Sequence, residues 1–416
     1  MGFDLLIRGG RVIDPASGQD GRADLGVSEG RIAALAPDLP ADNARAVIDA
    51  RGCLVTPGLI DLHTHVYWGG TSLGVDPDAI AAPSGVTTFV DAGSAGAGNF
   101  LGFRAHVIAP SAVRILAFVN IAFPGIFGFS GRVMVGECSI PGLLDPVEAA
   151  ACMAEHADIA VGVKVRTGAI AGAGTDILPL ERAIDTAERA GLPVMAHIDK
   201  PPPAREAVLD RLRRGDVLTH CYRPAPNAPT DDEGQILAEM TAARGRGVLF
   251  DIGHGMGSFS FDIARTMLEQ GFPPDVISSD LHLFCADGPA FDLAVCLSKF
   301  RALGLGLMET IAAATTRPAA WLGRPELGTL APGTPADIAL WREVAGEVTL
   351  TDSTGRAQTG AVRLVSQGIV AGGRWIANPE AEQPRDLTMP AAPETRTQAE
   401  IARARFGRPW EGKGNS

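Results

Sequence analysis

The sequence predicts an α/β protein whose centre is a closed (β/α)8, TIM-like barrel, with a small split β-sandwich domain formed by both chain ends. Three observations predict this. The middle of the chain alternates short Val/Ile/Leu-rich runs with helical patterns, which is typical of a parallel sheet covered on both faces. Eight such runs favour a barrel over an open sheet. Near both ends, apolar alternation is punctuated by Gly and Asp-Pro, as in β-hairpins.

The two ends of the chain are predicted to share one domain. Hairpin-like stretches such as FDLLIRGGRVID and ADLGVSEGRIAALA fill residues 1–56, and GTLAPGTPADIALW and VRLVSQGIVAGGRW repeat the style in 325–378. We therefore expect these two ranges to form the β-sandwich around a barrel of residues 57–324. Residues 379–416 are rich in Pro, Ala, Glu, Arg and Thr and lack periodicity, so we expect a C-terminal extension.

The barrel elements follow from the same runs. The clearest helices are expected at 145–157 and 176–191, the second beginning with Asp176 as its N-cap and ending at Gly191. The expected strands are 59–66, 86–92, 114–122, 159–166, 192–198, 216–221, 248–254 and 276–281.

Composition narrows the class of protein. The chain has 46% hydrophobic and 20% charged residues, as a soluble globular protein with a large core does. Its net charge of -12 disfavours nucleic acid and anionic membranes as partners. No 18-residue apolar run suggests a membrane span, and the start of the chain lacks the layout of a signal peptide. Six cysteines without C-x-x-C spacing indicate reduced thiols. We expect a cytoplasmic, homo-oligomeric enzyme acting on a small molecule.

A pair of histidines ends the first predicted strand. His63 and His65 point to the same side of that strand, so one metal ion could take both imidazoles. The alternative is a buried pair that bonds to backbone groups. We favour metal ligation, because three further candidate ligands also end later strands.

Lys164 lies among valines that are predicted to be buried. An unpaired lysine there is costly, and burial lowers its pKa towards the neutral amine. A neutral amine can react with carbon dioxide to give a carbamate, an anion able to bridge two cations. The alternative is a lysine paired with a carboxylate such as Asp61 or Asp280. We favour the carbamate, because it explains a lysine among metal-binding groups.

The remaining candidate ligands also end strands. His197 and His220 end consecutive predicted strands and could hold a second metal ion. Asp280 ends the eighth run, where its carboxylate could bind the first ion and accept a proton from bound water. Two ions roughly 3.5–4 Å apart would follow the general two-metal pattern. Zinc suits imidazole ligands, with manganese and iron as alternatives.

The chain contains five motifs in the order found in the amidohydrolase superfamily, which it resembles: GLIDLHTH, GVKVR, MAHI, LTHC and ISSDLH. Within that superfamily it is most similar to the dihydroorotase-like branch, among proteins labelled amidohydrolase/deacetylase. The likeness spans residues 3 to 375, and the two ends resemble that superfamily's split β domain. It implies two zinc ions bridged by N6-carboxylated Lys164, with Asp280 as the catalytic proton shuttle. Dihydroorotases usually carry an arginine two residues after the second histidine. Here Tyr67 and then Trp68 follow, so dihydroorotase activity is not expected.

The expected reaction is hydrolysis by metal-bridged hydroxide, with Asp280 moving the proton. The first substrate hypothesis is a small carboxylate-bearing molecule such as an N-acyl amino acid, cleaved at its acyl, and in particular its acetyl, group. An esterase acting on O-acetyl α-hydroxy acids is the alternative. A non-catalytic scaffold with the same fold is a third, which the complete ligand set disfavours.

Four residues are candidate substrate contacts. Arg166 lies two residues past Lys164 and could hold a carboxylate in two hydrogen bonds, or form a salt bridge under the rim. His254, in a glycine-rich loop, could donate to a substrate oxygen. Tyr67 and Trp68 could wall the pocket or pack against a loop.

Overall fold

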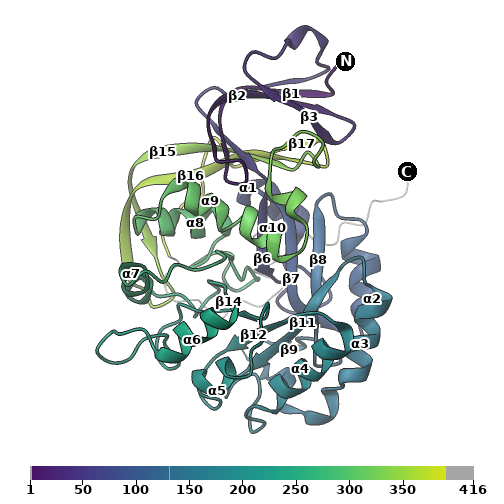
Figure 1. Cartoon of the computed structure of the whole chain (residues 1–416), viewed down its shortest axis with the longest axis vertical. Coiled ribbons are helices and arrows are strands. Elements are labelled where there is room, and N and C mark those ends of the chain that lie inside the picture. The colour runs from purple at the N-terminus through teal and green to yellow at the C-terminus, as the bar shows by residue number, and fades with distance from the viewer. Residues whose placement is uncertain (1, 131, 390–416) are drawn as a thin grey trace.

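The computed structural model describes residues 2–130 and 132–389 and contains two large sheets, the smaller domain lying above the parallel strands in Figure 1. The seven-stranded parallel sheet has the order β14-β13-β12-β11-β8-β7-β6. Its strands are β6 (Leu59–Thr64), β7 (Val86–Gly96), β8 (Arg114–Asn120), β11 (Ala160–Thr167), β12 (Val194–Ile198), β13 (Val217–Leu218) and β14 (Leu249–Phe250). Within this sheet, each strand pairs with the next sheet strand along the chain. Between β8 and β11, the short strands β9 (Gly128–Phe129) and β10 (Met134–Val135) form a separate hairpin. Seven of the eight predicted strands are thus confirmed.

The eighth predicted strand, 276–281, is not a regular strand. Its first residue makes one parallel bridge to Asp251, just beyond β14, and Leu281 makes another to Thr64 at the end of β6. The backbone between these bridges cannot stay extended, because Asp280 has φ 47°. The segment therefore contacts both edges of the parallel sheet through single bridges.

Helices follow the strands, and α2 to α6 lie along the outer side of the parallel strands (Figure 1). The helix predicted at 145–157 is confirmed, and the side chain of Asp145 accepts hydrogen bonds from two amides of its first turn. The helix predicted at 176–191 ends at Gly191 as expected. Its N-cap prediction was wrong, because Asp176 adopts φ 48° in a turn and the helix begins after Ile177. The α-helices are α1 (Pro77–Ser84), α2 (Phe100–Phe103), α3 (Pro146–Glu155), α4 (Leu178–Ala190), α5 (Arg205–Leu209), α6 (Ala238–Arg246), α7 (Phe261–Glu269), α8 (Leu293–Ala302), α9 (Leu307–Ala312) and α10 (Thr316–Trp321).

The second sheet combines both ends of the chain, as the sequence predicts. Its order is β17-β16-β15-β5-β1-β2-β3, with β4 beside β1. Instead of two separate layers, hydrogen bonds join all eight strands into one continuous sheet, because β5 pairs with β1 on one side and β15 on the other. The strands are β1 (Leu5–Asp14), β2 (Gln19–Ser28), β3 (Arg31–Ala36), β4 (Val47–Asp49), β5 (Leu54–Pro57), β15 (Ile338–Thr351), β16 (Ala357–Ala371) and β17 (Arg374–Ala377).

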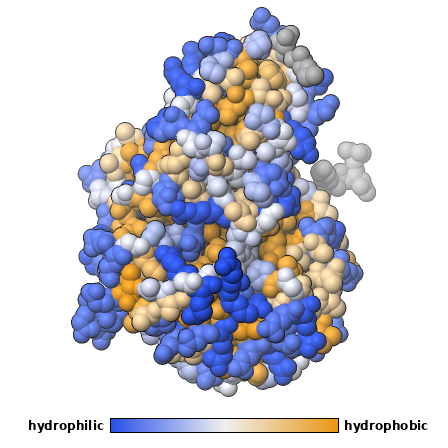
Figure 2. Space-filling view, viewed as in Figure 1, coloured by the Kyte–Doolittle hydropathy of each residue, from blue (hydrophilic) through white to orange (hydrophobic). Residues whose placement is uncertain are grey.

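The long strand β16 joins the second sheet to two helices, α8 and α1. The Ser298 hydroxyl of α8 accepts a hydrogen bond from the Leu364 amide of β16 at 3.1 Å. The Ser366 hydroxyl donates to the Ala82 carbonyl of α1 at 2.6 Å. The face in Figure 2 mixes hydrophilic and hydrophobic areas, and one hydrophobic area lies over the second sheet at the top. Of the predicted extension, residues 390–416 lie outside the described residues. No helix among residues 2–130 and 132–389 has the length and apolar character needed to span a bilayer.

Candidate active site

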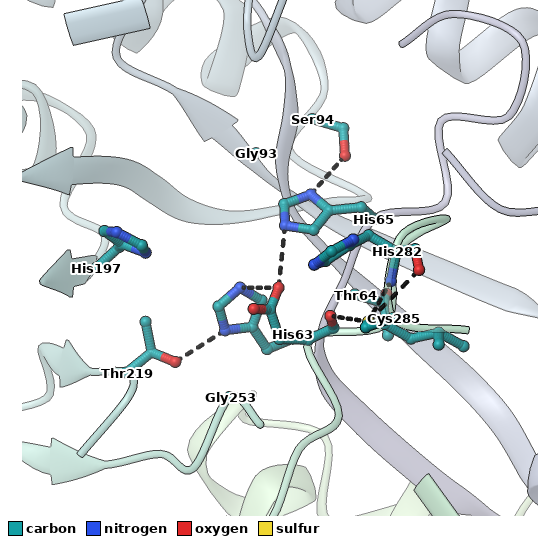
Figure 3. Close-up of polar contacts among 12 residues, drawn as sticks. His63, Thr64, His65, Gly93, Ser94, His197, Thr219, Gly253, His282 and Cys285 are labelled. Carbon is teal, nitrogen blue, oxygen red and sulfur yellow. Dashed lines mark hydrogen bonds and ion pairs between the residues drawn. The ribbon is translucent and has the colours of Figure 1, made fainter. Parts of the chain in front are cut away.

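The structure gathers the six predicted metal ligands at the carboxyl end of the parallel sheet, where β6, β11, β12 and the segments after β13 and β14 end. Figure 3 shows His63 and His65 together, Thr219 and Ser94 behind their rings, and His197 across from them. All six side chains are buried except that of His197, which is partly exposed. The six are His63, His65, Lys164, His197, His220 and Asp280.

The first group joins the strand β6 histidines to Asp280. Oδ1 of Asp280 lies 3.2 Å from Nε2 of His63 and 3.3 Å from Nε2 of His65. One ligand atom from each of these residues lies within 4.8 Å of the others, as a shared metal ion requires. Burial alone would raise the pKa of Asp280, but the adjacent histidines lower it well below its usual range. Asp280 is therefore a carboxylate.

The second group is the histidine pair at the ends of β12 and β13. Nδ1 of His197 lies 2.8 Å from Nε2 of His220. Nδ1 of His220 lies 2.7 Å from the Gly253 carbonyl, to which it must donate, so Nε2 of His220 carries a lone pair. Two facing ring nitrogens at this distance need a proton or a cation between them, and Nε2 of His197 is buried without a hydrogen-bond partner. This donor set fits a metal ion.

Lys164 lies beside the first group and contacts β12 through Met195. Its Nζ lies 3.2 Å from Nε2 of His63 and 3.2 Å from the sulfur of Met195. Among the described residues, no ion pair within 4 Å joins Lys164 to a carboxylate. Asp61, one of its possible partners, instead accepts hydrogen bonds from the amide and hydroxyl of Ser279 at 2.9 and 2.5 Å. Burial lowers the pKa of Lys164 to about 7, although Asp280 opposes the shift.

Two hydroxyl groups behind the strand β6 histidines were missed by the sequence analysis. The Thr219 hydroxyl lies 2.8 Å from Nδ1 of His63 and donates to Oδ2 of Asp251 at 2.7 Å. The Ser94 hydroxyl lies 2.8 Å from Nδ1 of His65. Because Nδ1 of each ring is occupied by a hydroxyl, Nε2 faces Asp280. Hydrogen-bond partners of metal-binding histidines commonly orient the rings in this way. The sequence signal that could have identified Thr219 as part of the site was its position next to the predicted ligand His220.

The glycine-rich loop after β14 approaches the site closely. Gly253 has φ 47°, and a Cβ there would overlap the Thr219 hydroxyl and crowd the rings of His63 and His220 at 2.9 Å. Glycine is therefore required at this position by both space and backbone conformation.

Arg166, the predicted substrate contact of β11, is engaged within the protein. Its Nη1 lies 3.1 Å from Oε2 of the buried Glu137, and its guanidinium lies 5.4 Å from the centre of the Phe129 ring. Of the two alternatives that the sequence left open, the structure contains the salt bridge. A contact with substrate stays a prediction.

The other predicted substrate contacts also have partners in the protein. His254 is fully buried, with Nε2 2.8 Å from Nζ of Lys299 and Nδ1 2.9 Å from the Gly255 carbonyl. Both ring nitrogens thus have partners within the protein, and the expected donation to substrate stays a prediction. The Tyr67 ring packs 4.7 Å from the ring of Phe103 in α2, and its role as a pocket wall stays a prediction. Trp68 is partly exposed, and its role as a pocket wall stays a prediction.

Comparison with known proteins places this site in a family. The family model described as "Amidohydrolase family" matches residues 54–372. The chain belongs to the amidohydrolase family. This amidohydrolase is 35% identical to a deacetylase from Agrobacterium fabrum over 79% of its own chain and 80% of the relative. It is 31% identical to a deacetylase from Enterococcus faecalis over 91% of its own chain and 100% of the relative.

Solved structures agree with the family assignment. A crystal structure described as a dihydroorotase has a TM-score of 0.81 and 32% identity, and covers 90% of this chain and 98% of that one. A crystal structure described as an adenine deaminase has a TM-score of 0.83 and 30% identity, and covers 90% of this chain and 100% of that one. The amidohydrolase is thus a hydrolase that acts on C–N bonds, and its family typically binds divalent metal ions.

Proposed function

We propose that this amidohydrolase is a binuclear-metal deacetylase that removes an acyl group, in the first instance acetyl, from a small carboxylate-bearing substrate such as an N-acyl amino acid. The observation that carries the proposal is the convergence of four histidines, one aspartate and one buried lysine at one end of the sheet, where no carboxylate of the described residues forms an ion pair with the lysine. The deacetylase names of two relatives that match most of this chain support the reaction class.

The proposed ligands divide as the contacts do. His63, His65 and Asp280 would hold one ion, and His197 and His220 the other. Zinc is expected because imidazole predominates. When bound, the ions would lower the pKa of a coordinated water and polarise the acyl carbonyl.

Carboxylated Lys164 would bridge the two ligand groups. Its lowered pKa leaves a large fraction of neutral amine near pH 7. That amine can add to carbon dioxide and lose a proton, giving a carbamate in place of the ammonium. No carboxylate among the described residues competes for Lys164 within 4 Å, which supports this modification.

Asp280 is the proposed proton shuttle. Its carboxylate is ionised and lies against both strand β6 histidines, so it can accept a proton at one oxygen and release it to the leaving amine. We also infer that the parallel sheet closes into the (β/α)8 barrel through residues 276–281, which carry Asp280. The bridges of this segment to Asp251 and Thr64 support closure.

The test combines metal analysis with a substrate screen. Purified enzyme should contain close to two metal equivalents and release acetate from N-acetyl amino acids or from acetylated α-hydroxy acids. Lys164→Met should lower the bound metal and abolish most turnover. The matched control is Lys299→Met, because Lys299 is also fully buried but bonds to His254 and the Pro289 carbonyl and to none of the six proposed ligands, and this variant should keep its metal. Full metal and full rate in Lys164→Met would refute the carbamate.

A further inference from the structure

Three arginines among the described residues are buried, and they differ in their partners. Arg166, Arg205 and Arg223 are 8%, 2% and 8% exposed. Arg166 is paired with Glu137, whereas no ion pair within 4 Å joins a carboxylate to Arg205 or Arg223 in the described parts of the chain. A buried charge without a counter-ion is costly. Two such guanidinium groups beside a proposed active site therefore require an explanation.

Arg223 lies next to the His197 strand end. It follows His220 by three residues, and its Nη1 donates to the carbonyl of Ile198, the residue after His197, at 2.5 Å. Its Nε is buried and has no hydrogen-bond partner. One edge of the guanidinium thus anchors the side chain to β12, while Nε still lacks an acceptor.

Asp199 does not form an ion pair with Arg223. The Asp199 carboxylate acts on Arg223 electrostatically but lies beyond ion-pair distance. It accepts hydrogen bonds from the amides of Ile170 and Ala171 at 3.4 and 3.3 Å, and it lies 3.6 Å from Nε2 of His197.

Arg205 adds a second positive charge behind Arg223. Its Nη2 donates to the Asn227 carbonyl, its Nη1 lies 3.8 Å from the sulfur of Met240, and its Nε has no partner. Burial, together with the charge of Arg223, lowers the pKa of Arg205 to about 9. The two guanidinium groups therefore create a positive potential, which Asp199 opposes at Arg223 and Glu239 opposes at Arg205, neither through an ion pair within 4 Å.

We propose that Arg223, with Arg205 behind it, binds the carboxylate of the substrate beside His197. This inference rests on the proposed function and specifies which residue recognises the acid group. A substrate carboxylate would supply the missing counter-ion and an acceptor for Nε, and guanidinium groups bind carboxylates through parallel hydrogen bonds. Arg166 is the weaker candidate, because Glu137 already supplies its counter-ion.

The test compares one pair of substrates in four proteins. The substrates are an N-acetyl amino acid that the wild-type enzyme hydrolyses and the corresponding N-acetyl amino acid amide, which lacks the negative charge. The proteins are zinc-loaded wild type, Arg223→Met, Arg223→Lys and Arg166→Met, each checked for zinc content and thermal unfolding. Arg223→Met should raise KM for the acid at least about 30-fold, with kcat and the KM for the amide within about threefold of wild type. Arg223→Lys should recover part of the affinity.

The outcomes separate the inference from the function beneath it. If Arg223→Met leaves the KM of the acid unchanged, or raises both KM values alike, the inference is wrong while the deacetylase function stands. If only Arg166→Met shows the acid-specific effect, the carboxylate contact belongs to Arg166. If wild-type enzyme hydrolyses no carboxylate-bearing acyl substrate, both proposals fail. Should Arg223→Met not fold, Arg223→Gln is judged by the same criteria, and calorimetric binding of the acid to Asp280→Asn with and without Arg223→Lys provides a second measurement: a weaker Kd supports the inference, and an equal one overturns it.

Discussion

Thr219→Val tests whether the hydroxyl behind His63 prepares the site for metal. The Thr219 hydroxyl is the donor to Oδ2 of Asp251, whose Oδ1 already lacks a partner, and both residues are fully buried. Valine would leave this carboxylate with only Nδ1 of His63, at 3.5 Å. An unsatisfied buried acceptor costs about 1–3 kcal/mol. Loss of such a second-sphere partner typically weakens metal binding by roughly 10- to 100-fold.

The assay follows from these two magnitudes. Zinc affinity is measured by competition with a chelator, and the free energy of unfolding of metal-free protein is measured in urea. Thr219→Ser is the matched control, because it keeps the hydroxyl and should stay close to wild type in both measurements. If Thr219→Val binds zinc as tightly as Thr219→Ser, the hydroxyl does not orient His63, and the reasoning is refuted.

Three further predictions concern the proton carrier, a buried lysine and a glycine turn. Asp280→Asn should lower kcat at least about 100-fold with an unchanged circular dichroism spectrum, since it removes the proton acceptor; undiminished turnover would exclude the shuttle. Burial lowers the pKa of Lys299 from 10.5 to about 8, so between these values the unfolded chain holds a proton that the folded chain has released, and stability rises with pH. Lys299→Met should remove roughly 3 kcal/mol of that rise, measured as the difference between the two proteins in urea at pH 7 and pH 10.5; parallel curves would contradict it. Gly85→Ala should cost roughly 3 kcal/mol, because Gly85 has φ 70° and a Cβ would overlap the Trp341 ring, whereas Gly191→Ala, at φ 65° in open space, should cost about 1 kcal/mol. Equal losses in thermal or urea unfolding would show that the overlap is relieved.

Local patterns predicted the ligand-bearing strands. The runs that lead to His65 and contain Lys164 and His197 have the apolar composition of buried parallel strands, which is recognisable from a few neighbouring residues. The run ending at Asp280 was recognised as part of the sheet, but its left-handed backbone was not, because no local pattern required it.

The partners of these residues were harder to predict. Thr219 lies 156 residues from His63, and Lys299 lies 45 residues from His254. Hydrogen bonds over such separations depend on strand register and side-chain direction at the same time, and a single sequence specifies neither of them locally. This is why the sequence did not predict the contact of His254 with the buried Lys299.

The sequence by itself determined which residues could form a metal site and that both chain ends build one β domain, because apolar periodicity and strand-end chemistry are local properties. That this domain is one continuous sheet was decided by the tertiary structure. Only the tertiary structure decided which charges are neutralised. Arg166 and Arg223 both follow predicted ligands closely, yet one meets Glu137 and the other meets no acid within ion-pair distance among the described residues. Electrostatic pairing falls off over a few ångströms, so it is fixed by the folded positions of groups that are distant in the chain.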